Sequence, residues 1–493
     1  MTDAPSVDPD ALRLMRAGRL AEALPLAERA VAHASLCVPG HSFLASLLFK
    51  LGRARDAGEV IDRAAQLGTG TAEAYDGLAY VSTELGRHEQ ANALYRRAID
   101  LEPRRPRSWY HLACSERSFG RLEEAEEACE RAIAVDGREY PSLLLRSELQ
   151  VQTADTNHIA DLQLRLADPH LDIHGRIFLG YALAKELDDV QRFDEAFHCF
   201  ALAAAARRSQ IRYDVAGDER RLKRIAEVFS DAWAQDYGVS LASGAHGDSP
   251  YIFIVGLPRS GTTLVERILT GLDGVRSNGE TENVARALTA ASASNGGAAI
   301  ERAAAADPAA LAEHYGRLAR FVTGAGRVVE KLPTNYLYLG AIRRALPGAR
   351  IVWVRRSPLD SCFALYRTVF GEAYPFSYDF DELARYYAAY DGLRAHWSRL
   401  FGDAIHEVLY EDLVREPQRV GAALAQFCGL EWRRDATDIQ SNRSVSLTAS
   451  AAQVRRPIYG SSSGRWRHYR AHLTPLTSAL RRLGIPLPDG AGP

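Results

Sequence analysis

Residues 251–269 read YIFIVGLPRSGTTLVERIL, and this stretch decides the fold of the second half of the chain. The apolar, β-prone run 251–255 predicts a buried parallel strand. A glycine-bounded loop, 256–261, follows it, and 262–269 reads as a helix. In such a unit the backbone N–H groups converge at the helix start, where the helix dipole favours an anion. The sequence therefore predicts an α/β domain with a parallel sheet and an anion site at this loop.

The loop differs from that of nucleotide triphosphatases at one informative position. Their pattern is G-x-x-x-x-G-K-[ST], whereas here Thr262 stands where the lysine would be and Arg259 supplies the positive charge from inside the loop. The missing lysine is the group that clamps the β- and γ-phosphates. A kinase-like P-loop enzyme therefore stays only as an alternative.

The segment LPRSGTTL, 257–264, resembles the 5′-phosphosulfate loop of sulfotransferases. The resemblance is to tyrosylprotein sulfotransferases and their bacterial relatives that carry tetratricopeptide repeats, and it extends over residues 250–470. It implies transfer of a sulfuryl group from 3′-phosphoadenosine 5′-phosphosulfate (PAPS) to a hydroxyl acceptor. The residues that it implies for binding the 5′-phosphosulfate are Arg259, Ser260, Gly261, Thr262 and Thr263.

The same resemblance implies two further catalytic residues beside Arg259. Glu280, in Gly-Glu-Thr after the loop and its helix, matches a general base; Glu282 is the second candidate, and Glu280 can also simply begin a helix. Lys331 ends a short apolar strand that starts at Val328, and it matches a lysine near the bridging oxygen. Its charge would balance the charge that develops on the leaving phosphate.

Two later segments resemble the nucleotide-binding parts of the family. In ARIVWVRRSPLD, 349–360, a second buried strand leads to Arg356, which matches the arginine that binds the 3′-phosphate. The serine that the family carries eight residues later is Ala364 here, and Ser361 is the nearest replacement. The other implied nucleotide contacts are Tyr410, at the end of a strand over 406–410, and Ser450 and Arg465 near the C-terminus.

The expected chemistry does not call for a metal. A sulfuryl group carries one negative charge fewer than a phosphoryl group, so Arg, Lys and backbone donors can suffice. The sequence shows no cluster of His, Asp and Glu with metal-ligand spacing, and we predict no metal site.

The first third of the chain is repetitive. Gly-Arg recurs at Gly18, Gly52, Gly86 and Gly120, in steps of 34 residues, and alanines recur with the same step. This period resembles the tetratricopeptide repeat, a stack of helical hairpins. A degenerate unit near 179–207 repeats part of the pattern. We predict an all-α repeat domain over 1–215, a helix and linker over 216–249, and the α/β sulfotransferase domain over 250–493.

Partners and location follow from the repeats and the composition. The repeat groove is suited to a peptide or protein acceptor, but the repeats can equally brace the enzyme or mediate a homodimer. Sixty Lys plus Arg against 62 Asp plus Glu disfavour nucleic-acid binding, even at the basic-aromatic run 465–470. Six scattered cysteines, no signal peptide and no long apolar segment predict a cytoplasmic protein without a membrane span.

The acceptor is the open part of the sequence-based hypothesis. Peptidyl tyrosine is favoured by the match of Glu280 and Lys331 and by a repeat domain suited to peptides. A glycan, a lipid or a small phenol remains an alternative acceptor. A non-catalytic repeat scaffold is the alternative from another class, and Ala364 is the one site residue that favours it.

Overall fold

The computed structural model describes residues 7–67, 70–239, 249–292, 296–324, 326–442, 444–448, 451–488 and 490. The chain divides into two compact units, Met1–Leu149 and Gln150–Pro493. Each unit has its own core and is described separately.

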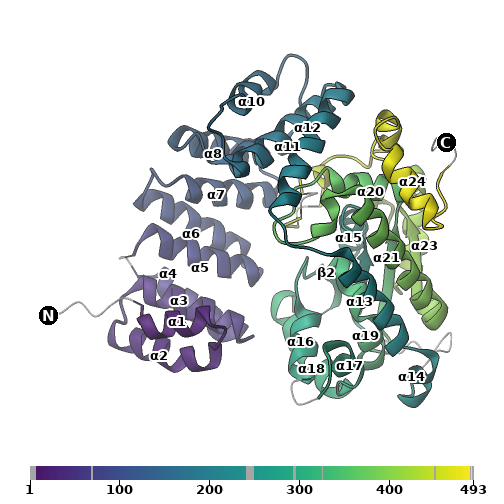
Figure 1. Cartoon of the computed structure of the whole chain (residues 1–493). Helices are drawn as coiled ribbons and strands as arrows, with labels where there is room; N and C mark the ends of the chain where they lie inside the picture. The colour runs from purple at the N-terminus through teal and green to yellow at the C-terminus, as the bar shows by residue number, and fades with distance from the viewer. Residues whose placement is uncertain are drawn as a thin grey trace. The chain divides into compact units, whose positions relative to one another are not determined.

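The first unit is a stack of helical hairpins, which follow one another in chain order (Figure 1). Four hairpins are followed by a ninth helix that packs on the last pair. The helices are α1 (Pro9–Arg16), α2 (Leu20–His33), α3 (Val38–Lys50), α4 (Ala54–Ala65), α5 (Ala72–Glu84), α6 (His88–Leu101), α7 (Pro106–Phe119), α8 (Leu122–Val135) and α9 (Tyr140–Leu149).

The repeated Gly-Arg pairs form the turns within these hairpins. The four glycines have φ between 72° and 82°, a left-handed conformation that glycine adopts at little cost. The N–H of each following arginine donates to the carbonyl five residues earlier, for example Arg53 to Leu48 at 2.9 Å, which satisfies the end of the first helix. Ala11, Ala45, Ala79 and Ala113 have no exposed surface, because they lie where helices approach each other closely.

The degenerate hairpin near 179–207 has the predicted form. Helices α11 (Ile173–Asp189) and α12 (Phe193–Ser209) pack against each other, and the Arg192 N–H donates to the Leu187 carbonyl at 2.8 Å, as in the four repeats. Gln191, with φ of 64°, takes the place of the glycine.

This fifth hairpin belongs to the second unit, so the boundary between the units lies at 149/150, well before the predicted border at 215. The reason is packing that the repeat period does not reveal. The Tyr181 hydroxyl donates to the Tyr366 carbonyl at 3.1 Å, and Phe197 stacks on His472 with ring centroids 4.4 Å apart. The fifth hairpin is therefore part of the core of the α/β unit.

The second unit is built on a five-stranded parallel sheet in the order β2-β3-β1-β4-β5. Its strands are β1 (Tyr251–Gly256), β2 (Val275–Ser277), β3 (Arg327–Glu330), β4 (Arg350–Arg355) and β5 (Ile405–Leu409). The four predicted strands are present, and β2 is an additional one. In register, Ile254 lies opposite Val352 and Trp353 lies opposite Glu407.

Helices cover both faces of the sheet. On one face, side chains of α15 (Thr262–Thr270) and α23 (Pro417–Phe427), such as Ile268 and Leu424, form a core with Ile254 and Val352. On the other face Tyr315 packs on Tyr251 and Phe253, while α21 (Phe380–Phe401) packs through Tyr390 on Trp353. The sheet is thus buried on both sides, as its apolar strands predict.

The remaining helices complete this unit. They are α10 (Ile159–Leu166), α13 (Val215–Val228), α14 (Asp231–Asp236), α16 (Asn283–Ala291), α17 (Ala299–Ala304), α18 (Pro308–Thr323), α19 (Leu339–Ala345), α20 (Pro358–Tyr366), α22 (Tyr410–Arg415) and α24 (Thr474–Arg482), with short 3-10 turns that include η1 (Pro333–Tyr338), η5 (Gln453–Arg455) and η6 (Arg465–Tyr469). None of the helices in the described ranges is long and apolar enough to span a bilayer.

Candidate active site

The carboxyl ends of all five strands carry a candidate site residue. The anion loop follows β1, Glu280 follows β2, Lys331 follows β3, Arg356 follows β4 and Tyr410 follows β5. Because the strands are parallel, these ends lie along one edge of the sheet, where open α/β sheets bind their ligands.

The loop after β1 is folded tightly around positions where a larger side chain would not fit. Gly261 has φ of 103°, and a Cβ there would lie 2.4 Å from Cδ2 of the Tyr410 ring. A Cβ on Gly256 would lie 2.5 Å from the Val354 carbonyl oxygen. Arg259 itself is left-handed, with φ of 65°, a strained conformation of the kind that clusters at functional sites.

Two polar atoms at this loop are buried but unsatisfied. Within the part of the chain that the structure describes, Ser260 Oγ and Arg356 Nε have no hydrogen-bond partner. Buried polar groups are rarely left without one, so each such atom calls for an explanation. A hydroxyl and a guanidinium N–H beside the amino end of α15 are donors suited to an anionic group.

Arg356 joins the loop to the C-terminal part of the chain. Its Nη1 donates to the Arg259 carbonyl at 2.9 Å, and its Nη2 donates to the carbonyl of Ser462. The guanidinium also lies 4.8 Å from the centre of the Tyr410 ring. Burial, the largest influence, raises the pKa of Tyr410, so the ring remains a neutral phenol beside the arginine.

The C-terminal segment reaches the loop through two further contacts. Arg259 Nη2 donates to Gln453 Oε1 at 3.2 Å, and the Thr263 hydroxyl donates to Thr448 Oγ1 at 3.3 Å. Thr448 and Gln453 therefore lie against the anion loop, as does Ser462 through Arg356.

Glu280 and Lys331 form a close ion pair. Lys331 Nζ lies 2.6 Å from Glu280 Oε1 and 3.6 Å from Oε2 of Glu266, which lies one turn into α15. The lysine side chain is fully buried, whereas 35% of the Glu280 side chain is exposed. The carboxylate is thus open to an incoming group, and the ammonium is held inside.

Ser361 lies close to the loop, although its hydroxyl is already used. It lines a small pocket together with Ser260 and Arg356, and its Oγ donates to the Arg356 carbonyl at 3.2 Å. Its role in place of the serine missing at Ala364 stays a prediction.

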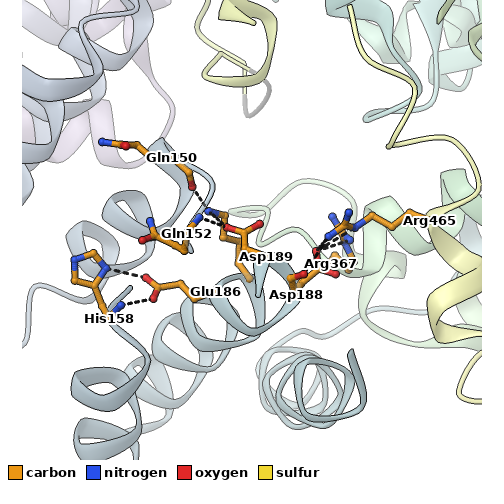
Figure 2. Close-up of polar contacts among 9 residues, drawn as sticks. Gln150, Gln152, His158, Glu186, Asp188, Asp189, Arg367 and Arg465 are labelled. Carbon is orange, nitrogen blue, oxygen red and sulfur yellow. Dashed lines mark hydrogen bonds and ion pairs between the residues drawn. The ribbon is translucent and has the colours of Figure 1, made fainter. Parts of the chain in front are cut away.

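Arg465 forms an ion pair with an acid of the fifth hairpin. Its Nη2 lies 2.6 Å from Asp188 Oδ2, an oxygen that also pairs with Arg367 at 3.0 Å (Figure 2). The Tyr469 hydroxyl donates to the other oxygen of the same carboxylate. A nucleotide contact from Arg465 therefore remains a prediction, and Ser450 lies outside the described residues.

Several acids that support the site were not singled out from the sequence. Glu266 faces Lys331, Asp360 accepts from the Gly464 N–H at 2.7 Å, and Asp188 binds Arg465. Only Glu266 could have been found from the local sequence, because it lies in the helix that begins at the anion loop. The other two contacts join residues that are far apart in sequence, and no spacing within one sequence indicates them. In the described ranges no group of three or more His, Cys, Asp or Glu side chains is arranged to hold a metal ion.

Comparison with known proteins matches this architecture. Residues 250–434 match the model of the sulfotransferase family. They form a sulfotransferase domain. Residues 11–72 and 78–142 match the tetratricopeptide-repeat model, so the predicted combination of a repeat region and a sulfotransferase domain on a parallel sheet is confirmed.

Individual relatives are distant. An uncharacterized protein of Aquifex aeolicus (strain VF5) is 28% identical over 357 residues, which cover 69% of this chain and 46% of that protein's length. The sulfotransferase domain of the Synechococcus PCC 7002 olefin synthase is 18% identical over 50% of this chain and 100% of that domain, with a TM-score of 0.36. YrrB, a repeat protein with an unusual peptide-binding site, is 15% identical over 39% of this chain and 89% of that chain, with a TM-score of 0.27.

Proposed function

We propose that this protein transfers the sulfuryl group of PAPS to a hydroxyl acceptor and that the acceptor is a peptidyl tyrosine. The observation that carries the proposal is the ion pair of Glu280 and Lys331 beside an arginine-containing anion loop. A relationship to the tyrosylprotein sulfotransferases is part of the proposal. The proposal also includes a cytoplasmic location and a peptide acceptor that is held in the groove of the repeats.

The residues present fit PAPS. Ser260 Oγ and Arg356 Nε, both buried and without a partner in the described ranges, are suited to its phosphate oxygens. Arg259, Thr262 and Thr263, together with the N–H groups at the start of α15, would hold the 5′-phosphosulfate. Bound there, PAPS supplies the activated sulfuryl group. We infer that no metal takes part, because these fixed cationic and N–H donors can balance the charge.

Each side chain would have its own role in the reaction. Glu280 would take the proton from the acceptor hydroxyl, since its carboxylate is the partly exposed member of the pair. The acceptor oxygen forms its bond to sulfur as the bond from sulfur to the bridging oxygen breaks. Lys331 and Arg259 would balance the negative charge left on 3′-phosphoadenosine 5′-phosphate (PAP). In the free protein Lys331 holds the Glu280 carboxylate in place for this role.

The first test is calorimetric titration with PAP, with ATP and magnesium as the comparison ligand. We expect PAP to bind tightly and ATP weakly, and Arg259→Ala and Arg356→Ala to abolish PAP binding. Arg433→Ala is the matched control, because this exposed arginine pairs with Asp273 and Asp435, and it should bind PAP as the parent protein does. Tighter binding of ATP would favour a kinase-like enzyme, and binding of neither ligand would favour the non-catalytic scaffold.

The second test identifies the acceptor. Transfer of labelled sulfate from PAPS is measured with a tyrosine-containing peptide and with the same peptide carrying phenylalanine. Label on the tyrosine peptide alone supports the proposal. Label on a glycan, a lipid or a free phenol, with none on the peptide, would replace the acceptor but keep the reaction.

A further inference from the structure

Glu330 is a buried carboxylate at the end of β3, directly before Lys331, and its residue has no exposed surface. It accepts hydrogen bonds from three side chains of one short segment. Its partners there are the Asn278 amide at 2.9 Å, the Thr281 hydroxyl at 2.8 Å and the Asn283 amide at 3.4 Å. The Tyr315 hydroxyl of α18 donates to it as well, at 3.4 Å.

These contacts bracket Glu280, which lies in the middle of the segment 278–283. The backbone of the segment is also tied to β3: the Asn278 N–H donates to the Val329 carbonyl at 2.9 Å, and the Lys331 N–H donates to the Gly279 carbonyl at 3.1 Å. The side chains on either side of Glu280 are thus turned inward to Glu330, while Glu280 itself points to Lys331.

We infer that Glu330 is a positioning residue that holds the segment 278–283 in the one arrangement that places the Glu280 carboxylate against Lys331. The inference rests on the proposed role of Glu280 as the base. A buried carboxylate is costly unless several donors satisfy it, and here three of its four donors come from the segment that carries the base. Because Glu330 and Lys331 are adjacent, one strand end fixes both members of the catalytic pair.

The reaction is sensitive to such placement. A misplacement of about 1 Å at a reacting group can lower a rate about 100-fold. Replacing Glu330 by glutamine keeps the size of the side chain but exchanges one acceptor oxygen for an NH₂ group, which would face the Asn278, Asn283 or Thr281 donor. The segment should then lose at least one of its attachments without loss of the sheet.

The first test does not depend on activity. Amide hydrogen exchange is followed by mass spectrometry in the full-length protein and in its Glu330→Gln variant, over peptides that cover 278–283. We expect exchange there to become about tenfold faster or more, as for a segment that opens locally. Glu186→Gln is the matched control, because Glu186 is equally buried but binds His158, far from β3 in the sequence. Unchanged exchange over 278–283 in Glu330→Gln would overturn the inference.

The second test asks whether Glu330 acts through Glu280. We expect Glu330→Gln to lower kcat about 100-fold, to leave PAP affinity within about twofold, and to cause no further loss when Glu280→Gln is already present. Independent losses that multiply in the double variant would contradict the inference. If the parent protein transfers no sulfuryl group to any acceptor, the proposed function fails, and the exchange experiment alone decides the role of Glu330.

Discussion

At the scale of single residues, the site is organised around charges that are held inside the protein. Lys331 is fully buried and faces two carboxylates, Glu280 and Glu266. Removal of the lysine would leave these two negative charges facing each other, so its loss would affect both stability and chemistry. Glu280 is the more informative residue to change, because its side chain is partly exposed.

We predict that Glu280→Gln lowers kcat by about 10²- to 10⁴-fold, the usual contribution of a general base. PAP affinity should change little, because Glu280 contacts Lys331 and lies outside the anion loop. The measurement is the initial rate of sulfate transfer together with calorimetry. Glu282→Gln is the matched comparison, and a larger loss in that variant would move the role of the base to Glu282.

A second prediction concerns stability and pH. Burial, opposed by four hydrogen bonds, raises the pKa of Glu330 from 4.5 to about 7. A carboxyl group whose pKa is higher in the folded state binds more protons there, so its contribution to stability declines as pH rises between 4.5 and 7. We expect the melting temperature of Glu330→Gln, relative to that of the parent protein, to rise over this range. A melting-temperature difference that stays constant between about pH 5 and about pH 8 would contradict the shifted pKa of Glu330.

At the scale of secondary-structure elements, the C-terminal turn of α11 connects distant parts of the second unit. Its acids Glu186 and Asp189 bind His158 and the Gln152 N–H, while Asp188 binds Arg367 and Arg465 (Figure 2). Burial alone would raise the pKa of Asp188, but the charges of Arg367 and Arg465 outweigh burial and lower it. Asp188 is therefore a buried anion with two cationic partners.

We predict that Asp188→Asn destabilises the second unit by about 3 kcal/mol or more, as expected when one partner of a buried ion pair is removed. PAP affinity should also fall, because the freed segment around Arg465 is continuous with Ser462, which contacts Arg356. Thermal unfolding and calorimetry measure the two effects. Asp194→Asn is the control, since its contact with His472 is exposed. Equal effects of the two substitutions on the melting temperature and on PAP affinity would contradict the prediction that Asp188 holds the segment around Arg465.

Local patterns allowed most elements to be predicted. The strand–loop–helix unit, the strands before Lys331 and Arg356, and the repeat turns all follow from short stretches of sequence. The strand β2 was missed because it has three residues, too few to show a period. The predicted helix and linker over 216–249 contain two helices, α13 and α14, because Ser230 accepts from the Trp233 N–H and begins a new helix.

The main residues of the candidate site could be predicted from the sequence, but the residues that hold them in place could not. Glu280, Lys331 and Arg356 could be named because a family resemblance gave each one a role. Glu330 and Asp188 could not be named, because their partners are distant in the sequence. Asn283 lies 47 residues from Glu330, and Tyr469 lies 281 residues from Asp188. A single sequence does not show which distant residues meet.

At the scale of the whole molecule, the two compact units predict where the chain can be cut. A fragment 150–493 keeps the fifth hairpin, and we expect it to fold and to bind PAP. A fragment 216–493 lacks Tyr181, Asp188 and Phe197, which contact Tyr366, Arg465 and His472. We expect it to aggregate or to unfold at a much lower temperature. Circular dichroism and calorimetry of both fragments test this, and equal stability would contradict the assignment of the hairpin to the second unit.

The fifth hairpin has the turn geometry of the repeats, but it packs in the core of the α/β unit, and this limits how the length of the chain can change. Hairpins of 34 residues before Leu149 contact mainly their neighbours, so whole copies could be gained or lost there as in other solenoids. The hairpin at 173–209 has no such freedom, because its removal would take Asp188 and Tyr181 out of the α/β unit. The array can therefore vary in length during evolution only on its N-terminal side.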